Sequence, residues 1–189
     1  MYIKAGFFNV ISAILMSLFL NISYASDAWQ KAEPGAQKNE KWQMVSQATA
    51  TWLWVDIYQA SLFLPEYANA GKLFKQQLLN DSIAVKLRLC YQRDLTASQI
   101  ITAAEKILPQ NLTEQVSTEV ERLHRSYRDV GSGDCYALEH FNNGITQLSL
   151  NSEPLFETEA KGFKQAYFGI WLGAESLSQD LKQSLLEVF

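Results

Sequence analysis

Four side chains beside strand-like apolar segments carry groups that could act on a ligand: Tyr58, Arg88, Tyr91 and Arg93. A guanidinium and a phenol next to an apolar surface can stabilise an anion, or a negative charge that develops during a reaction. Each also has an ordinary structural role. Arg93 beside Asp94 is typical of a salt-bridged helix start, and Arg88 falls on the polar face of its predicted strand. Both tyrosines suit a core position with the hydroxyl at the rim.

Tryptophans could add an apolar wall to such a site, although they more often pack within a core. Those of interest are Trp52, Trp54 and Trp171. The sequence assigns no catalytic residue. As candidate ligand-binding residues we name Tyr58, Trp54, Tyr91 and Arg93.

Other reaction chemistries find no support in the sequence. The chain has two histidines and two cysteines, and none of them is spaced as metal ligands are, so we expect no metal site and no cofactor. Glu139 and His140 are neighbours on a predicted strand, so their side chains point to opposite faces and form no dyad. No Gly-x-Ser-x-Gly turn or glycine-rich phosphate loop is present.

The N-terminus has the features of an export signal. Lys4 precedes an apolar run, Phe7–Ile22, and Ser23-Tyr24-Ala25 fits the small-x-small cleavage rule. The alternative is an uncleaved anchor, but the run is short and no basic cluster follows it. We therefore expect a signal peptide over residues 1–25, a periplasmic or secreted protein, and no membrane segment after cleavage. Loss of Lys4 changes the net charge of −4 to about −5, and with no basic cluster nucleic acid is not an expected partner.

Two cysteines, Cys90 and Cys135, lie in separate predicted strands. An exported chain permits a disulfide, which here would close a loop of about 45 residues and contribute roughly 4 kcal/mol. Two unpaired thiols on different strands are the alternative, and the sequence alone leaves both open.

The apolar pattern predicts a single domain over residues 45–189, preceded by an irregular lead over residues 26–44. Trp42–Leu64 is strand-like with two apolar faces, which indicates either a central strand pair or a hairpin bent near Asp56. Ile83–Tyr91 alternates as a half-buried strand, and Cys135–Phe141 with Ile145–Leu150 reads as a hairpin. The remaining segments predict helices over 97–108, 112–127, 159–172 and 177–188, with Gly173 as a left-handed stop. This order favours an α+β fold.

Four phrases follow one another along the chain: Val55–Phe63, Tyr91-Gln-Arg93-Asp94-Leu-Thr, Asp129-Val130-Gly-Ser-Gly133-Asp134, and the C-terminal block from Ala166 to Leu186. In this order they resemble phrases of the bacterial chalcone-isomerase-like proteins. Val55–Phe63 is similar to a strand phrase of that family, with Tyr58 at its first tyrosine. The resemblance implies an antiparallel sheet with helices packed on one face, an open-faced sandwich with an apolar cleft between the layers.

Family resemblance does not carry the isomerase activity to this chain. Plant chalcone isomerases stabilise an oxyanion with an arginine, which in many relatives lies about eight residues before the strand tyrosine. Counting back from Tyr58 reaches Ala50, and no lysine or arginine lies between Lys41 and Lys72. The resemblance and this alanine favour non-catalytic binding of a small hydrophobic ligand such as a fatty acid. The alternatives are an isomerase of an unidentified apolar substrate that uses Tyr58 with Arg93, and an envelope protein-interaction module with no partner indicated.

Overall fold

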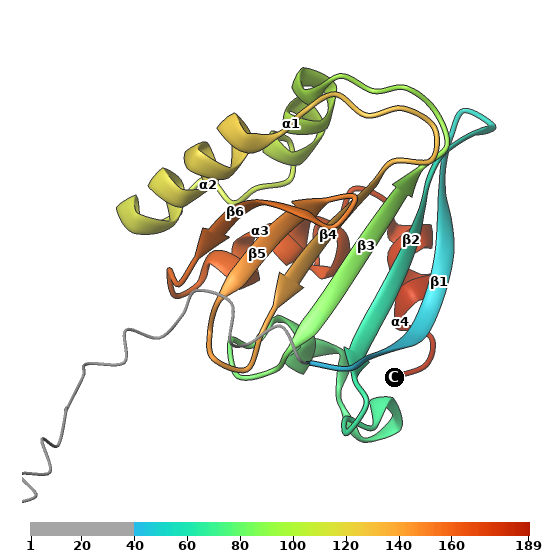
Figure 1. The fold of residues 1–189 in the computed structure, drawn as a ribbon. Coiled ribbons are helices and arrows are strands. Elements are labelled where there is room, and N and C mark those ends of the chain that lie inside the picture. The colour runs from blue at the N-terminus through green and yellow to red at the C-terminus, as the bar shows by residue number, and fades with distance from the viewer. Residues whose placement is uncertain (1–39) are drawn as a thin grey trace, which may run out of the picture. The chain divides into compact units, whose positions relative to one another are not determined.

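The computed structural model describes residues 40–189. The predicted signal peptide and residues 26–39 of the predicted lead lie outside this range. The described chain forms a six-stranded antiparallel sheet in which the strands neighbour one another in sequence order (Figure 1). The strands are β1 (Trp42–Trp52), β2 (Val55–Pro65), β3 (Val85–Tyr91), β4 (Cys135–His140), β5 (Thr146–Leu150) and β6 (Glu153–Thr158). The fold is therefore α+β, as predicted.

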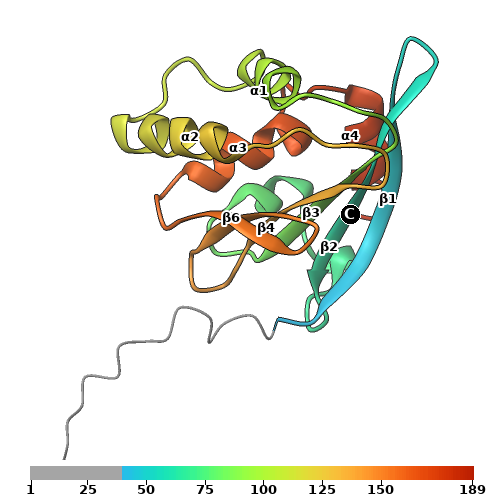
Figure 2. The same ribbon diagram turned by 45° about the horizontal axis from the view of Figure 1, so that its top comes forward.

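Helices cover one face of this sheet, as the second view shows (Figure 2). They are α1 (Ala97–Glu105), α2 (Glu114–Ser126), α3 (Phe163–Leu172) and α4 (Gln179–Leu186), with two 3-10 turns, η1 (Ala70–Lys72) and η2 (Lys75–Leu79). The residue pattern of strand β3 explains why the helices cover only one face of the sheet. Its residues alternate between buried side chains such as Leu87 and Leu89 under the helices and half-buried Lys86 and Arg88 on the opposite face.

Helix α3 forms the centre of the helix layer. Eight of its ten residues are buried, because it is apolar on nearly all sides. Phe163 and Tyr167 stack one turn apart at 5.5 Å between ring centroids, and Phe163 also contacts Phe156 of β6 at 5.4 Å. Such a helix fixes the distance between the sheet and the outer helices.

The segment Trp42–Leu64 is a hairpin, the second of the two alternatives. Its strands β1 and β2 turn at Leu53 and Trp54, whose φ angles are 46° and 70°. Asp56, two residues after Trp54, accepts a hydrogen bond from the Thr51 hydroxyl at 2.8 Å. A shift in register between Ala50 and Thr51 leaves Ile57 as the extra residue of a β-bulge. The first strand begins at Trp42, inside the predicted lead.

Three further elements differ from the sequence expectation. Strand β6 was not predicted, because Pro154 and the charged residues Glu153 and Glu157 on this edge strand conceal the strand pattern. Helix α1 ends at Glu105 rather than at residue 108, and α3 begins at Phe163 rather than at residue 159. Gly173 is not left-handed, since its φ is −76°. Glycine is needed there because a Cβ would lie 2.5 Å from the carbonyl oxygen of Gly169.

A disulfide joins Cys90 and Cys135 on the sheet face that the helices leave open. The two residues are direct partners in the β3–β4 register, and their Cα atoms are 4.0 Å apart. Closely spaced antiparallel pairs of this kind bring opposite side chains together. The sequence left this pairing open, and strand register supplies the missing geometry.

A tyrosine-lined cleft as the candidate functional site

A cleft of about 630 Å³ lies between the ends of β1, β2 and β3 and the inner side of α1. Trp171 of α3 and the Leu177-Ser178 segment before α4 close its other side. Its walls are mainly apolar, and the residues that line it are Ala50, Thr51, Trp52, Ile57, Tyr58, Tyr91, Leu95, Ser98, Gln99, Ile100, Thr102, Ala103, Ala104, Lys106, Tyr127, Trp171, Leu177 and Ser178.

Three residues on neighbouring strands form the sheet side of the cleft. Ala50 of β1 is the register partner of Tyr58 of β2, and Tyr58 is the partner of Tyr91 of β3. The two tyrosine rings meet edge to face with 5.7 Å between centroids. Ala50 is buried and presents only a methyl group, so the cleft wall beside the Tyr58 ring is small and apolar.

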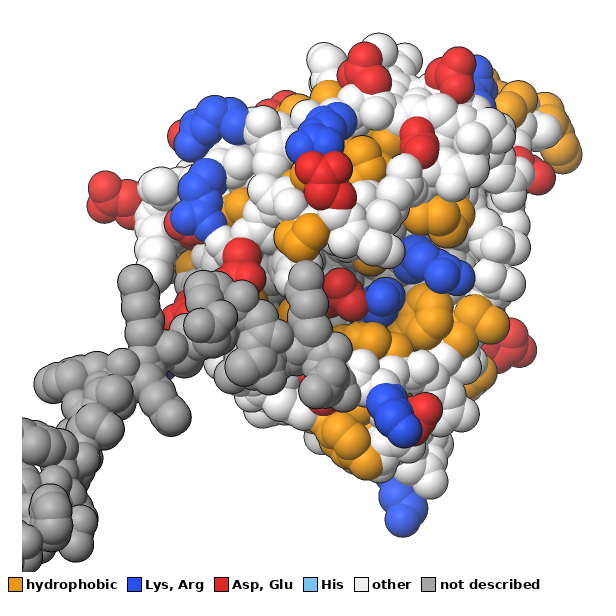
Figure 3. All heavy atoms as spheres, viewed as in Figure 1, with side chains coloured by type: hydrophobic (Ala, Val, Ile, Leu, Met, Phe, Trp, Pro, Cys, Tyr) orange, Lys and Arg blue, Asp and Glu red, His pale blue; other side chains and the backbone are white. Residues whose placement is uncertain are grey.

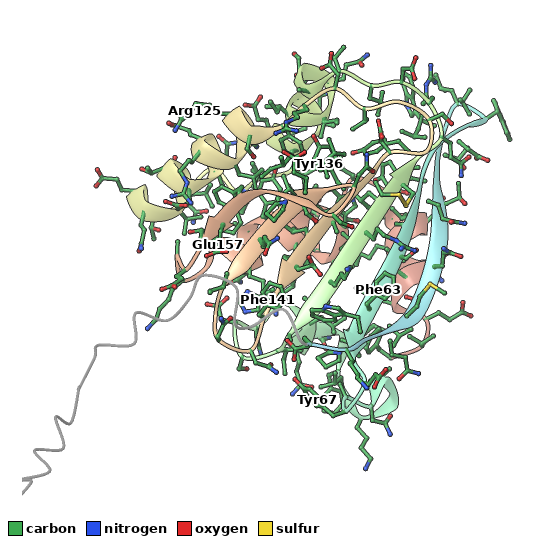
Figure 4. The ribbon with its side chains drawn as sticks, viewed as in Figure 1. Phe63, Tyr67, Arg125, Tyr136, Phe141 and Glu157 are labelled. Carbon is green, nitrogen blue, oxygen red and sulfur yellow. A yellow bond between two sulfur atoms is a disulfide. The ribbon has the colours of Figure 1, made fainter. Side chains whose placement is uncertain are left out.

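Aromatic contacts continue from the cleft into the core. Tyr91 meets Tyr136 at 6.2 Å between ring centroids, and Tyr136 meets Tyr127 at 5.0 Å. Tyr136 extends from β4 toward the helices (Figure 4). An inner void of about 10 Å³ shares Tyr91, Tyr127 and Trp171 with the cleft. The aromatic lining of the cleft therefore continues into the core at this void.

Most of these hydroxyl groups are committed to protein partners. Tyr167 donates to the hydroxyl of Tyr127 at 3.1 Å, and the Trp171 indole donates to the hydroxyl of Tyr58 at 3.1 Å. Tyr136 accepts from the Arg128 amide at 2.8 Å and donates to its carbonyl oxygen at 2.9 Å. These bonds hold the rings in place.

The hydroxyl of Tyr91 makes no hydrogen bond within residues 40–189, although its ring is buried. Burial raises the pKa of Tyr91 well above its ordinary value, and neighbouring tyrosines add to this rise. Burial likewise raises the pKa of Tyr58, against the lowering effect of the Trp171 hydrogen bond. Both groups are neutral phenols at physiological pH, so they can donate hydrogen bonds to a ligand but are poor bases.

Polar groups gather along the α1 side of the cleft. Ser98, Gln99 and Thr102 line it there, and Lys106 follows the last residue of the helix. Among the described residues that line the cleft, Lys106 is the one with a cationic side chain, and it is exposed. A cation at the rim and phenols further in would suit a ligand with an apolar body and an anionic or polar head.

The predicted binding residues divide into two groups. Tyr58 and Tyr91 line the cleft together, whereas Trp54 lies at the exposed tip of the β1–β2 hairpin and Arg93 is exposed outside the cleft. The expected ion pair between Arg93 and Asp94 is wrong, because Arg93 forms none within residues 40–189.

Two other groups secure the start of α1. Its first turn is held by Thr96, which forms a capping box with Gln99. The carboxylate of Asp129 also accepts a hydrogen bond from the Ala97 amide at 2.8 Å. The helix start is therefore fixed without Arg93.

Sequence reasoning missed Tyr127 and Lys106 as cleft residues. Tyr127 closes the apolar stripe of the second predicted helix, and the stripe does indicate burial, but it does not distinguish a cleft wall from the core. Lys106 lies at a helix end, where a lysine is ordinary. Only the closure of α1 over the strand ends brings these residues beside Tyr58.

The opposite face of the sheet carries a second, more polar hollow of about 510 Å³ (Figure 3). Lys86 forms an ion pair with Glu139 there at 2.9 Å. Arg88 lies on this polar face, as predicted, and its guanidinium is over the ring of Phe63, 5.2 Å from the ring centroid. Phe63 is labelled on this face in Figure 4. This hollow lacks the apolar walls of the cleft.

Residues 40–189 contain neither a metal-binding cluster nor a membrane-spanning helix. No cluster of three or more His, Cys, Asp or Glu residues in this range could hold a metal ion. None of the helices described is both long and apolar enough to cross a membrane.

Comparison with known proteins agrees with this architecture. The sequence matches a profile described as chalcone isomerase-like over residues 30–187. No protein of curated function matches it by sequence. Among solved structures, the fatty-acid binding protein of Arabidopsis thaliana is similar in fold, with a TM-score of 0.56 and 10% sequence identity, over 78% of this chain and 85% of the other. The chain belongs to the chalcone isomerase-like family.

Proposed function

We propose that the protein binds an apolar small molecule with one anionic head, such as a fatty acid, in the tyrosine-lined cleft, without converting it chemically. The observation that carries this proposal is the cleft itself, with apolar walls, neutral phenols inside and a single lysine at the rim. Its volume of about 630 Å³ falls in the usual range for small-molecule sites. The fold it shares with a plant fatty-acid binding protein supports the same ligand class.

Ala50, the cross-strand neighbour of Tyr58, favours binding over catalysis. A charge-stabilising group that acts on a ligand beside Tyr58 must point into the cleft. The register position next to that tyrosine is Ala50, which offers only a methyl group. Arg93, the cation that an isomerase using Tyr58 would need, does not line the cleft. The raised pKa of Tyr58 and of Tyr91 removes the phenolates as general bases near neutral pH.

Lysine at the rim favours a carboxylate head. The Lys106 ammonium forms no ion pair within residues 40–189 and so is free to meet a ligand anion. An acyl chain would then extend between the strand ends and α1, where its burial supplies most of the affinity. The predicted N-terminal export signal supports binding outside the cytoplasm.

The test is native mass spectrometry of protein isolated from the cell envelope without detergent, before and after incubation with long-chain fatty acids. We expect one bound acyl ligand per chain. Ala50→Phe should fill the cleft beside Tyr58 and abolish that adduct. Thr49→Phe is the matched control, because Thr49 is the preceding residue on the same strand and points to the opposite face of the sheet.

Two results would contradict the proposal. One is a wild-type protein that stays unliganded in every incubation. The other is an adduct that survives Ala50→Phe as well as it survives Thr49→Phe. Sequencing the N-terminus of the isolated protein tests the export signal separately, since cleavage is expected after Ala25.

A further inference from the structure

The tip of the β1–β2 hairpin is an exposed apolar surface that the cleft does not explain. It consists of Trp52, Leu53, Trp54 and Val55, with exposed fractions of 68%, 70%, 98% and 44%. We call these four residues the hairpin tip. The hairpin extends beyond the rest of the sheet in both ribbon views (Figures 1 and 2), and hydrophobic side chains stand at the corresponding edge of Figure 3.

These side chains occupy a turn that disfavours them. A two-residue hairpin turn with two positive φ angles normally takes Asn-Gly, because other side chains are strained there. Here the two residues are Leu53 and Trp54, at 46° and 70°. The β5–β6 hairpin of the same protein uses polar Asn151 and Ser152 at nearly the same angles, 49° and 72°. The tip therefore keeps large apolar groups at a cost to stability, while Trp54 is almost wholly exposed to water.

Charge around the tip indicates what kind of surface it could meet. No lysine or arginine lies between Lys41 and Lys72, so the hairpin carries no cation, and Asp56 beside the tip is acidic. With a net charge of −4 for the chain, an anionic surface would be repelled rather than attracted. An uncharged or zwitterionic apolar partner fits these residues.

The tip is also continuous with the mouth of the cleft. Trp52 belongs to both, and its neighbour Thr51 lines the cleft wall. The β-bulge at Ile57, another cleft residue, bends the hairpin at the same place. Whatever holds the tip therefore faces the cleft opening, where an apolar ligand would enter or leave.

We propose that the hairpin tip inserts into the surface of a zwitterionic lipid bilayer and holds the cleft mouth against it, so that an acyl ligand passes between membrane and cleft. This role rests on the proposed function, since docking serves a cleft that holds an apolar chain. Tryptophan indoles are suited to the boundary between headgroups and acyl chains. A narrow projecting tip can enter a fluid bilayer without a matching pocket, which a protein partner would have to supply.

The experiment is flotation of the envelope-isolated protein with phosphatidylcholine vesicles, together with quenching of its tryptophan fluorescence by brominated lipid. The wild-type protein should float, be quenched, and keep both properties in about 1 M salt, where charge attraction is screened beyond roughly 3 Å. The double variant Leu53→Asn, Trp54→Gly gives the turn its preferred residues, so it should fold at least as well. It should partition into vesicles at least about tenfold less.

The matched control is Phe74→Asn, which removes a similarly exposed aromatic residue, at 72%, from the turn before η2. It should float like the wild type. The proposal is overturned if the wild type fails to float with phosphatidylcholine, if it floats only with anionic lipid at low salt, or if the double variant floats unchanged.

Ligand binding is read out separately from docking. The double variant should keep its acyl adduct in native mass spectrometry, and Ala50→Phe should lose the adduct yet still float. Failure of the docking proposal thus appears in flotation alone, and failure of the proposed ligand binding appears in the adduct alone.

Discussion

The indole nitrogen of Trp171 donates a hydrogen bond to the hydroxyl oxygen of Tyr58 at 3.1 Å, and this bond ties α3 to β2 at the wall of the cleft. The bond leaves the hydroxyl proton of Tyr58 free to point elsewhere. Tyr91, its neighbour across the β2–β3 register, has a hydroxyl with no such bond within residues 40–189. The two phenols thus differ in structural role while sharing one site.

That difference predicts unequal effects of removing each hydroxyl. Tyr58→Phe leaves the buried indole of Trp171 without its acceptor, so the free energy of unfolding should fall by about 1 to 2 kcal/mol. Tyr91→Phe removes a hydroxyl that has no such bond and should change stability by less than about 0.5 kcal/mol. Urea unfolding of both variants measures this. Equal losses would show that the Trp171 bond contributes nothing specific.

The disulfide should stabilise the fold without shaping the cleft, because it lies on the opposite sheet face. Replacing Cys90 and Cys135 together by alanine opens a loop with a sequence separation of 45 residues and should lower the free energy of unfolding by about 4 kcal/mol. Chemical unfolding of the wild type with and without a reductant gives an independent value. A double variant that unfolds at the wild-type denaturant midpoint would contradict the expectation.

Much of the fold could be predicted from the alternation of apolar residues. Strand β3 shows why: each buried residue from Val85 to Tyr91 alternates with a half-buried one, so periodicity alone assigns both faces. Periodicity fails to predict structure where the spatial neighbours of a residue determine its conformation. Pro154 hides β6 because an edge position tolerates a proline that a central strand would not. Gly173 was misassigned because its need for glycine comes from the nearby Gly169 carbonyl group and not from its own φ.

The site was harder to predict than the fold. Tyr58 and Tyr91 could be named because both lie on strands that face the apolar layer. Trp54 looked like their neighbour in the sequence pattern, but the chain reverses at Leu53-Trp54, where both φ angles are positive. Neither residue type indicates such a turn, which normally carries Asn-Gly. Lys106 joins the site only through the packing of α1 over the strand ends. Packing between residues far apart in the chain produces no periodic pattern in the sequence, so it could not be predicted.

Lys106 at the rim should distinguish ligands by their head group. Lys106→Met should weaken binding of a fatty acid by up to roughly fivefold, the range of a solvent-exposed ion pair. The fatty alcohol of the same chain length has no charge and should bind both proteins equally. Competition in native mass spectrometry at low salt compares the two ligands directly. An equal loss for acid and alcohol would mean that the lysine contributes only its alkyl chain.

His140 should make the fold sensitive to acid. Its imidazole is buried, with Nε2 2.8 Å from the Asp81 carbonyl oxygen and Nδ1 2.8 Å from the Thr146 hydroxyl. A carbonyl only accepts, so the neutral ring donates from Nε2 and accepts at Nδ1. Burial lowers the pKa of His140 below 6.5, and the nearby Lys164 ammonium lowers it further, although the Asp81 carbonyl and carboxylate oppose the shift.

The sign of the pH effect follows from that lowered pKa. Below pH 6.5 the unfolded chain takes up the proton before the folded protein does, so stability should fall as the pH decreases toward the folded-state value. His140→Gln should flatten the urea-unfolding profile below about pH 6.5, where the wild type loses stability. His124, whose pKa burial also lowers, accounts for some remaining slope. Identical pH profiles for variant and wild type would exclude His140 as the source.

The last turn of α3 offers a test in which two glycines four residues apart should respond in opposite directions. A Cβ at Gly173 would lie 2.5 Å from the Gly169 carbonyl oxygen, so Gly173→Ala must displace backbone and should cost about 1 to 3 kcal/mol. A Cβ at Gly169 meets no neighbouring atom within 4 Å, so Gly169→Ala should instead gain about 0.5 to 1 kcal/mol from helix propensity. Thermal unfolding of the two variants measures both changes in stability and their signs.

Because Trp171 lies between these glycines and lines the cleft, Gly173→Ala should also weaken ligand binding, whereas Gly169→Ala should not. Destabilisation by both substitutions would show that α3 is packed too tightly for either.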